Sequence, residues 1–208
     1  KRQSDVWANS ELFQLKKNGQ PKAVAGVPPD YFAAEGQLWG NPLYDWTAHE
    51  RTGFAWWIQR IKSNLEFYDI VRLDHFRGFE SYWYVPATET TARNGRWTPC
   101  PGLELFKALR KACPEAKLVA EDLGEITDEV NELRAITGLP GMAVLQFAFD
   151  GDADNTYLPH NYERNCVAYS GTHDNDTSLG WYQALDDETQ DYIRCYLGIT
   201  GDTIAWDL

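Results

Sequence analysis

The distribution of apolar side chains along the chain predicts four helices after residue 51. In residues 52–66, the apolar side chains of Phe54, Trp57, Ile58 and Ile61 recur at the spacing of one helical face. The same kind of pattern predicts further helices over residues 103–113, 127–138 and 186–198.

Two of these helices carry signals for where they begin and end. The helix over residues 127–138 has Thr127 at its N-cap and Gly138 after its last turn, and its apolar residues predict an inward face formed by Val130, Leu133 and Ile136. The helix over residues 186–198 begins with acidic residues, which the helix dipole favours, and ends at Gly198.

Four near-continuously apolar runs predict strands that are buried on both faces, as in a parallel sheet. They cover residues 67–74, 116–124, 141–150 and 165–174. Strands that alternate with helices indicate the α/β class, and four strands amount to about half of a (β/α)8 barrel. An open, doubly wound sheet is the structural alternative, although the sequence lacks the GxGxxG loop that such sheets use to bind phosphate.

The first 46 residues predict mostly loop. Turn signals at residues 26–30 and 40–42 flank the stretch DYFAAEGQLW, which is rich in aromatic side chains. A long loop inside a domain is usually functional or disordered, and the aromatic residues favour function.

Charge and composition narrow the possible ligands. The net charge of −12 disfavours nucleic acid and anionic membranes as partners, because their phosphates require a basic surface. Nine Trp and eleven Tyr supply flat rings that can stack on weakly charged ligands such as sugars, besides filling a core. No apolar run approaches the ~20 residues of a membrane span. The four cysteines lack CxxC spacing, which is typical of reduced, mostly buried thiols in a reducing compartment.

Acidic residues stand where three of the predicted strands end. They are Asp74, the pair Glu121 and Asp122, and Asp174; Asp150 is a possible fourth member. A single acid at such a position is more often a helix cap or a solvated turn residue. In a barrel, however, the carboxyl ends of the strands converge on the mouth that holds the active site, so these acids are expected to meet there.

Basic residues accompany these acids and strengthen the case for a site. Arg72 lies two residues before Asp74, hence on the same side of an extended strand, while His75 and His173 each adjoin an acid. Clustered carboxylates suit either divalent metal binding or the cleavage of glycosidic bonds by an attacking carboxylate and a protonated partner.

Five stretches of the sequence resemble one known family. VAGVPPDYFAAEGQLWGNPLYDW, YDIVRLDHFRGFESYW, VAEDLG, GLPGMAVLQFAF and SGTHDNDT are similar to segments of the 4-α-glucanotransferases, or amylomaltases, of glycoside hydrolase family 77 in the α-amylase clan. The resemblance runs from about Asp5 to the end of the chain. It implies a (β/α)8 barrel with added subdomains and the transfer of α-1,4-linked glucan segments with retention of anomeric configuration, without a metal or other cofactor.

The resemblance also implies roles for individual residues. Asp74 matches the nucleophile, Glu121 the acid/base and Asp174 the third acid, which stabilises the transition state. Further residues match substrate contacts: Arg72, His75, Asp122 and His173, and, in a substrate-covering loop, Asp30, Tyr31, Phe32, Gln37 and Trp39.

These roles lead to a physical expectation for the two central acids. The Arg72 cation favours the ionised form of Asp74, whereas a drier setting is expected to raise the pKa of Glu121 so that it begins the reaction protonated. Double displacement requires carboxyl groups ~5–5.5 Å apart. An α-amylase-type hydrolase, a non-catalytic glucan-binding protein and a metal-dependent enzyme remain as alternatives.

The resemblance covers only part of a barrel. The predicted strands match about the fourth to the seventh of eight, so we expect one domain truncated at both ends, with residues 1–50 as the substrate-loop region and residues 51–208 as a partial catalytic barrel. Half a barrel leaves sheet edges unpaired, so the chain alone is not expected to be an active enzyme. The expected partners are α-1,4-glucans and malto-oligosaccharides, and the expected compartment is the cytoplasm, or the plastid in a plant.

Overall fold

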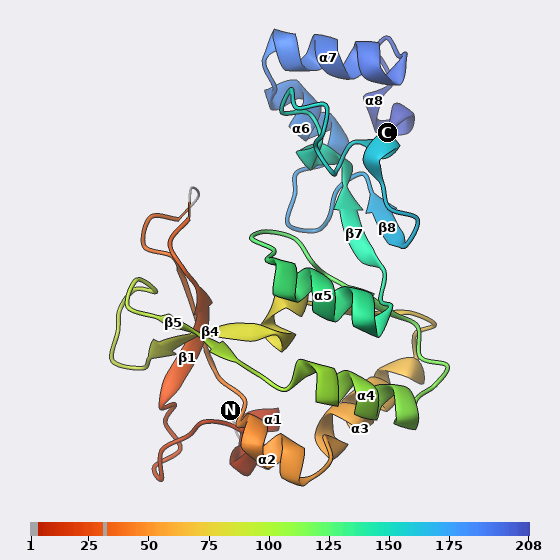
Figure 1. The fold of residues 1–208 in the computed structure, drawn as a ribbon. Helices are drawn as coiled ribbons and strands as arrows, with labels where there is room; N and C mark the ends of the chain where they lie inside the picture. The colour runs from red at the N-terminus through yellow and green to blue at the C-terminus, as the bar shows by residue number, and fades with distance from the viewer. Residues whose placement is uncertain (1–3, 31–32) are drawn as a thin grey trace. The chain divides into compact units, whose positions relative to one another are not determined.

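The computed structural model describes residues 4–30 and 33–208 and contains two compact units, Lys1–Gly138 and Leu139–Leu208. Each unit combines helices with short strands, as Figure 1 shows. The α/β class expected from the sequence is therefore confirmed.

A pair of parallel strands lies at the centre of the first unit. β3 (Val71–Leu73) pairs with β6 (Leu118–Ala120), and all three residues of β6 are buried. The strand predicted at residues 67–74 is wrong in extent, since Phe67 is 79% exposed and lies before the first paired residue. The backbone N–H groups of residues 67 and 68 both donate to the carbonyl of Asn64, so these residues form a turn after α3 and do not extend the strand.

Three helices accompany this strand pair and confirm three of the sequence predictions. They are α3 (Ala55–Leu65), α4 (Gly102–Ala112) and α5 (Asp128–Thr137). α4 packs against both α3 and α5 (Figure 1). Phe54, Trp57 and Ile61 are buried as predicted, while Ile58 is only partly buried.

The inward face of α5 differs in one residue from the prediction. Val130 and Leu133 are buried, but Ile136 is 54% exposed and Thr137 takes the buried position in its place. Residues at i, i+3 and i+7 share a helical face, whereas i+6 lies about 120° around the helix from i. Gly138 ends the helix in the left-handed conformation, with φ of 70°, as the sequence indicated.

An antiparallel sheet in the first unit was not predicted. Its strand order is β2-β1-β4-β5, formed by Gln37–Pro42, Ala23–Val27, Ser81–Pro86 and Arg96–Pro99. The expectation that residues 1–46 are mostly loop missed β1 and β2, which both lie there, along with two short helices, α1 (Asp5–Ala8) and a 3-10 turn at Ser10–Leu12. The central pairing joins Ala23 to Pro86, a contact far apart in sequence that no local pattern reveals.

The connections within the first unit contain two further short helices. α2 (Trp46–Arg51) begins at Asp45, whose side chain accepts a hydrogen bond from the Ala48 backbone N–H. A 3-10 helix, Phe76–Phe79, follows β3 and precedes β4. Most of its side chains are buried, which fixes the segment directly after the end of β3.

The second unit contains the other parallel strand pair. β7 (Gly141–Val144) pairs with β8 (Cys166–Tyr169), and every residue of β7 is buried. The strand predicted at residues 141–150 is shorter than expected, because a 3-10 turn at Leu145–Phe147 takes over after Val144. The predicted strand at residues 165–174 likewise ends early, at Tyr169.

Three helices each contribute one buried residue to the core of the second unit. α6 (Ser178–Ala184), α7 (Asp187–Leu197) and α8 (Ile204–Asp207) follow the strands, and a 3-10 turn at Pro159–Asn161 lies between β7 and β8. α7 confirms its predicted ends: the Asp186 side chain accepts from the Thr189 N–H, and Gly198 is left-handed with φ of 67°. The core comprises Leu145, Ala148, Phe149, Leu158, Tyr182, Ile193 and Ile204.

The cysteines and the membrane-spanning potential of the helices were also addressed from the sequence. All four cysteines are free thiols, but three are only partly buried and Cys195 is exposed, so the expectation of mostly buried thiols is wrong. In the described part of the chain, no helix combines the length and the apolar character needed to cross a bilayer.

Candidate active site

The first two acids follow directly after the paired ends of β3 and β6. Leu73 lies opposite Ala120 in the parallel register, so Asp74 and Glu121 come next on neighbouring strands. The backbone continues the pairing beyond the strands, since the Glu121 N–H donates to the Leu73 carbonyl at 3.0 Å and the Phe76 N–H donates to the Glu121 carbonyl at 2.8 Å. The parallel sheet therefore brings together two acids that are distant in sequence.

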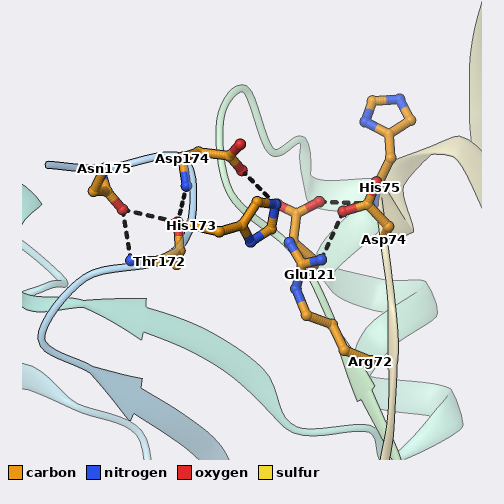
Figure 2. A network of polar contacts seen from close by, with 8 residues as sticks. All are labelled: Arg72, Asp74, His75, Glu121, Thr172, His173, Asp174 and Asn175. Carbon is orange, nitrogen blue, oxygen red and sulfur yellow. Dashed lines mark hydrogen bonds and ion pairs between the residues drawn. The ribbon is translucent and has the colours of Figure 1, made fainter.

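Arg72 and Asp74 form the ion pair that their spacing predicted. Arg72 Nη1 donates to Asp74 Oδ1 at 2.7 Å (Figure 2), with side chains 29% and 78% exposed, respectively. The contact engages one carboxylate oxygen of a side chain that is otherwise largely exposed. The pair is thus suited to present an anionic oxygen.

Glu121 has a different environment, because its side chain is partly buried. The backbone N–H groups of His75 and Leu123 donate to Oε2 and Oε1 at 2.7 and 2.9 Å. Burial raises the pKa of Glu121, the two N–H donors lower it, and the nearby charges of Asp74 and Arg72 respectively raise and lower it; the net pKa is raised. The direction expected from the sequence is confirmed.

His75 provides one of these donors from an unusual backbone conformation. Its φ and ψ are 49° and 56°, in the left-handed region. The imidazole contacts the edge of Trp39, with ring centroids 4.9 Å apart. Burial lowers the pKa of His75, as does the charge of Arg77, and Asp74 opposes them, so the neutral imidazole is favoured.

Arg77 is a buried cation that sequence reasoning did not single out. Its guanidinium lies over the Trp97 ring at 3.6 Å from the centroid, and Nη1 donates to the Glu125 carbonyl at 2.9 Å. Arg77 therefore connects β5 to the loop that follows Glu121. Its only signal in the sequence was its position three residues after Asp74. That position alone does not distinguish a buried arginine from a solvated one.

Asp122 forms an ion pair with Arg134 of α5. Its Oδ2 lies 3.2 Å from Arg134 Nε, and the two side chains are only 12% and 15% exposed. This ion pair ties the segment after β6 to the helix that follows it. Any contact of Asp122 with a sugar would have to use the part of the carboxylate that Arg134 leaves accessible.

The predicted substrate loop forms the connection and second strand of the β1–β2 hairpin. Gln37 and Trp39 lie in β2, where Trp39 Nε1 donates to Gln37 Oε1 at 3.2 Å. Asp30 Oδ1 accepts from the Ala33 N–H at 2.7 Å, which shapes the connection. Tyr31 and Phe32 lie outside the described residues.

His173 and Asp174 lie in the turn that follows β8 in the second unit. His173 Nε2 is 3.3 Å from Asp174 Oδ2, and both side chains are exposed (Figure 2). Asn175 Oδ1 accepts from both the backbone N–H and the hydroxyl of Thr172 at 2.8 Å, and the Asp174 N–H donates to the same hydroxyl at 3.3 Å. These hydrogen bonds give the turn a defined conformation in which the side chains of His173 and Asp174 are exposed.

Asp150, the possible fourth acid, forms a turn of its own. Oδ1 accepts from the Asp152 N–H at 3.0 Å and Oδ2 from Asn155 Nδ2 at 2.9 Å, and these donors lower the pKa of Asp150. Its hydrogen bonds are those of a turn-forming aspartate. Among the described residues, no group of three or more His, Cys, Asp or Glu side chains has an arrangement suited to holding a metal ion.

Comparison with known proteins gives a consistent family match. A family model described as 4-alpha-glucanotransferase matches residues 1–208. The chain is 56% identical over 209 residues to the 4-alpha-glucanotransferase of Synechocystis sp., covering 99% of this chain and 41% of that protein. It is 53% identical to the chloroplastic/amyloplastic 4-alpha-glucanotransferase of Arabidopsis thaliana, covering 99% and 36%.

Solved structures show the same relationship. The amylomaltase from Streptococcus agalactiae in complex with acarbose superposes with a TM-score of 0.90 at 43% identity, over 95% of this chain and 40% of that one. The amylomaltase from Corynebacterium glutamicum shares the fold, with a TM-score of 0.72 at 20% identity over 97% and 28%. The chain thus spans about two fifths of the length of the first relatives.

Proposed function

This chain belongs to the 4-alpha-glucanotransferase family, glycoside hydrolase family 77, and from that membership we propose that the intact protein moves α-1,4-glucan segments between malto-oligosaccharides. The reaction retains anomeric configuration and passes through a covalent glycosyl-enzyme. The S. agalactiae amylomaltase was solved with acarbose, which supports a ligand of the same kind for this chain.

The observation that carries the proposal is the contrast between the environments of the two acids. Asp74, paired with Arg72 and largely exposed, is suited to be the nucleophile. Glu121, whose pKa burial raises, is suited to hold a proton as the acid/base. A retaining glycosidase requires one carboxylate that attacks and a neighbouring carboxyl group that holds a proton.

The chemical steps follow from these roles. Asp74 attacks the anomeric carbon while Glu121 gives its proton to the departing glycosidic oxygen, and a glycosyl ester forms on Asp74. Glu121, now ionised, takes the proton of an acceptor 4-hydroxyl. That oxygen attacks the anomeric carbon, the ester bond breaks, and the new glycosidic bond has the original configuration.

The remaining predicted residues hold the sugar. Arg72, His75 and Asp122 contact it from the side of the two central acids, and His173 and Asp174 come from the second unit, with Asp174 stabilising the transition state. These roles follow from the family match, which implies a (β/α)8 barrel with β3, β6, β7 and β8 as about its fourth to seventh strands, residues 1–50 as the substrate-loop region and residues 51–208 as the catalytic barrel portion.

The aromatic substrate loop is assigned to acceptor binding and water exclusion. Asp30, Tyr31, Phe32, Gln37 and Trp39 form it, and the contact of Trp39 with the His75 ring supports a position beside the acids. Transfer must outcompete hydrolysis by abundant water, so the site must favour a sugar over water while the ester persists. The proposed compartment is the cytoplasm, or the plastid if the source is a plant.

Incubating the intact parent protein with maltotriose tests the function directly. Transfer produces glucose together with a ladder of longer oligosaccharides, whereas an α-amylase-type hydrolase produces only shorter products and a glucan-binding protein none. Asp74→Asn is expected to abolish turnover while maltotriose binding persists. A product mixture without longer oligosaccharides, or an active Asp74→Asn variant, would refute the proposal.

A further inference from the structure

The backbone of His75 is the feature that the proposed roles leave unexplained. His75 and Phe54 are the non-glycine residues with positive φ in the described part of the chain. The left-handed conformation is uncommon for residues other than Gly, although Asn, Asp and His adopt it more often than the rest. Such a conformation next to reacting groups calls for a specific reason.

The conformation directs the main chain of residue 75 toward Glu121. The His75 N–H donates to Glu121 Oε2 at 2.7 Å, and the next N–H, of Phe76, donates to the Glu121 carbonyl at 2.8 Å. Figure 2 shows the imidazole of His75 pointing away from the Glu121 carboxyl group, so the main chain makes this contact and the ring does not.

Close packing holds the turn in place. A Cβ at Gly78 would lie 2.9 Å from His75 Cδ2, so only glycine leaves room for the ring there. The Gly78 N–H donates to the His75 carbonyl at 2.9 Å, and Trp39 contacts the imidazole from its edge. Gly78 and Trp39 thus restrict the imidazole of His75, and the hydrogen bond from the Gly78 N–H restricts the backbone of His75.

We propose that His75 is a positioning residue for Glu121, and that its left-handed backbone directs an N–H group that orients the acid/base carboxyl. This inference rests on the proposed function. The hydrogen bond stabilises the ionised carboxylate, so it lowers the pKa of Glu121 against the increase that burial causes. Glu121 is thereby kept able both to donate the proton to the leaving group and to accept one from the next sugar.

A series of variants separates this role from a sugar contact by the imidazole. His75→Gly, His75→Asn and His75→Val, each made in the intact parent enzyme, all lack the ring. They differ in their tolerance of the left-handed conformation, which is highest for Gly and lowest for β-branched Val. We expect KM to rise in all three and kcat to fall in the order Gly, Asn, Val, with Val about 10- to 100-fold below Gly.

The pH profile provides a readout that a sugar contact would not change. Because β-branched Val disfavours the left-handed conformation, the backbone N–H of residue 75 should turn away from the carboxylate in His75→Val. Without this hydrogen bond Glu121 is harder to ionise, so the basic limb of kcat/KM should move up by about one pH unit. His75→Gly should leave it close to the parent position. Asp74 and Arg72, the charged groups that act on Glu121, are present in every variant.

Phe54→Val is the matched control for strain. Phe54 is the other left-handed side chain, with φ of 58°, and it is the N-cap of α3. The control should lower thermal stability without moving the basic limb. Equal kcat in the three His75 variants, or an unmoved limb in His75→Val, overturns the inference; if His75→Val does not fold, the same criteria apply to His75→Asn against His75→Gly.

Failure of this inference is distinguishable from failure of the proposed function. Glu121→Gln removes the acid/base itself and should abolish transfer. If Glu121→Gln stays active, the assignment of Glu121 is wrong and the inference is overturned with it. If Glu121→Gln is inactive and the His75 series shows no order, only the positioning role of His75 is overturned.

Discussion

Asp74 and Glu121 occupy equivalent positions on two parallel strands, each one residue beyond the register pair formed by Leu73 and Ala120. The two acids nevertheless have opposite surroundings. Asp74 faces outward beside Arg72, and Glu121 turns inward onto the N–H groups of His75 and Leu123. Equivalent backbone positions thus carry two carboxyl groups with different exposure and different hydrogen-bond partners.

Removing the charge of Arg72 should shift the pH dependence of the intact enzyme upward. Arg72 lowers the pKa of Glu121 against the larger effect of burial. Arg72→Met therefore raises this pKa further, and the basic limb of kcat/KM, which requires protonated Glu121, moves to higher pH. Because Asp74 also loses its partner, kcat should fall by about tenfold or more.

A matched arginine on the surface serves as the control for that experiment. Arg60 pairs with Asp5 at 3.3 Å, and both side chains are well exposed. Arg60→Met should leave the profile and kcat unchanged. A basic limb that stays in place in Arg72→Met, or moves to lower pH, would contradict the electrostatic coupling between Arg72 and Glu121.

Replacing Trp39 should alter the fate of the covalent intermediate. Trp39→Ala removes a half-exposed ring from beside His75, which admits water and weakens acceptor stacking. The ratio of hydrolysis to transfer should rise several-fold, measured as reducing ends released per new glycosidic bond. Trp39→Phe keeps an aromatic ring and should retain most of the transfer; an equal ratio in both variants would argue against the assigned role.

The ion pair of Asp122 and Arg134 should stabilise the loop after β6. Arg134→Met leaves a mostly buried carboxylate without its cation and should lower the free energy of unfolding by ~3 kcal/mol. The double variant Asp122→Leu with Arg134→Met removes both charges and should recover much of that loss. Denaturant titrations of the parent, the two single variants Asp122→Leu and Arg134→Met, and the double variant give the coupling, and additive losses would show that the pair contributes nothing.

Gly102 should resist a substitution that normally favours helices. Alanine in place of glycine inside a helix usually adds ~1 kcal/mol of stability. At Gly102, however, a Cβ would lie 2.0 Å from the Phe79 carbonyl oxygen, so Gly102→Ala should destabilise by about 1–3 kcal/mol.

Gly180 in α6 provides the comparison for that substitution. A Cβ there meets the Asp176 Oδ2 atom at 2.6 Å, but this atom ends a side chain that can rotate away. Gly180→Ala should therefore cost less than Gly102→Ala, as measured by thermal unfolding. If Gly102→Ala raised the unfolding temperature, the close approach of α4 to residue 79 would be refuted.

The helices could be predicted from the sequence because their signals are local. The N-cap position of Thr127, the left-handed Gly138 and the acidic start of α7 each depend on neighbours within one or two helical turns. The antiparallel sheet could not be predicted, since β1 pairs with β4 about sixty residues later and its strands are short. For the same reason the strand at residues 67–74 was predicted too long: only a partner strand decides where pairing begins.

The sequence by itself determined which residue types are available for chemistry and where they stand along the chain. Acids after apolar runs, Arg72 before Asp74 and the family motifs are all properties of sequence order. Only the tertiary structure decided which carboxyl group is buried, that the left-handed main chain of His75 holds Glu121, and that Arg77 reaches the Glu125 carbonyl. Proton affinity and hydrogen bonding depend on what surrounds a group in space, and segments far apart in the chain supply those surroundings.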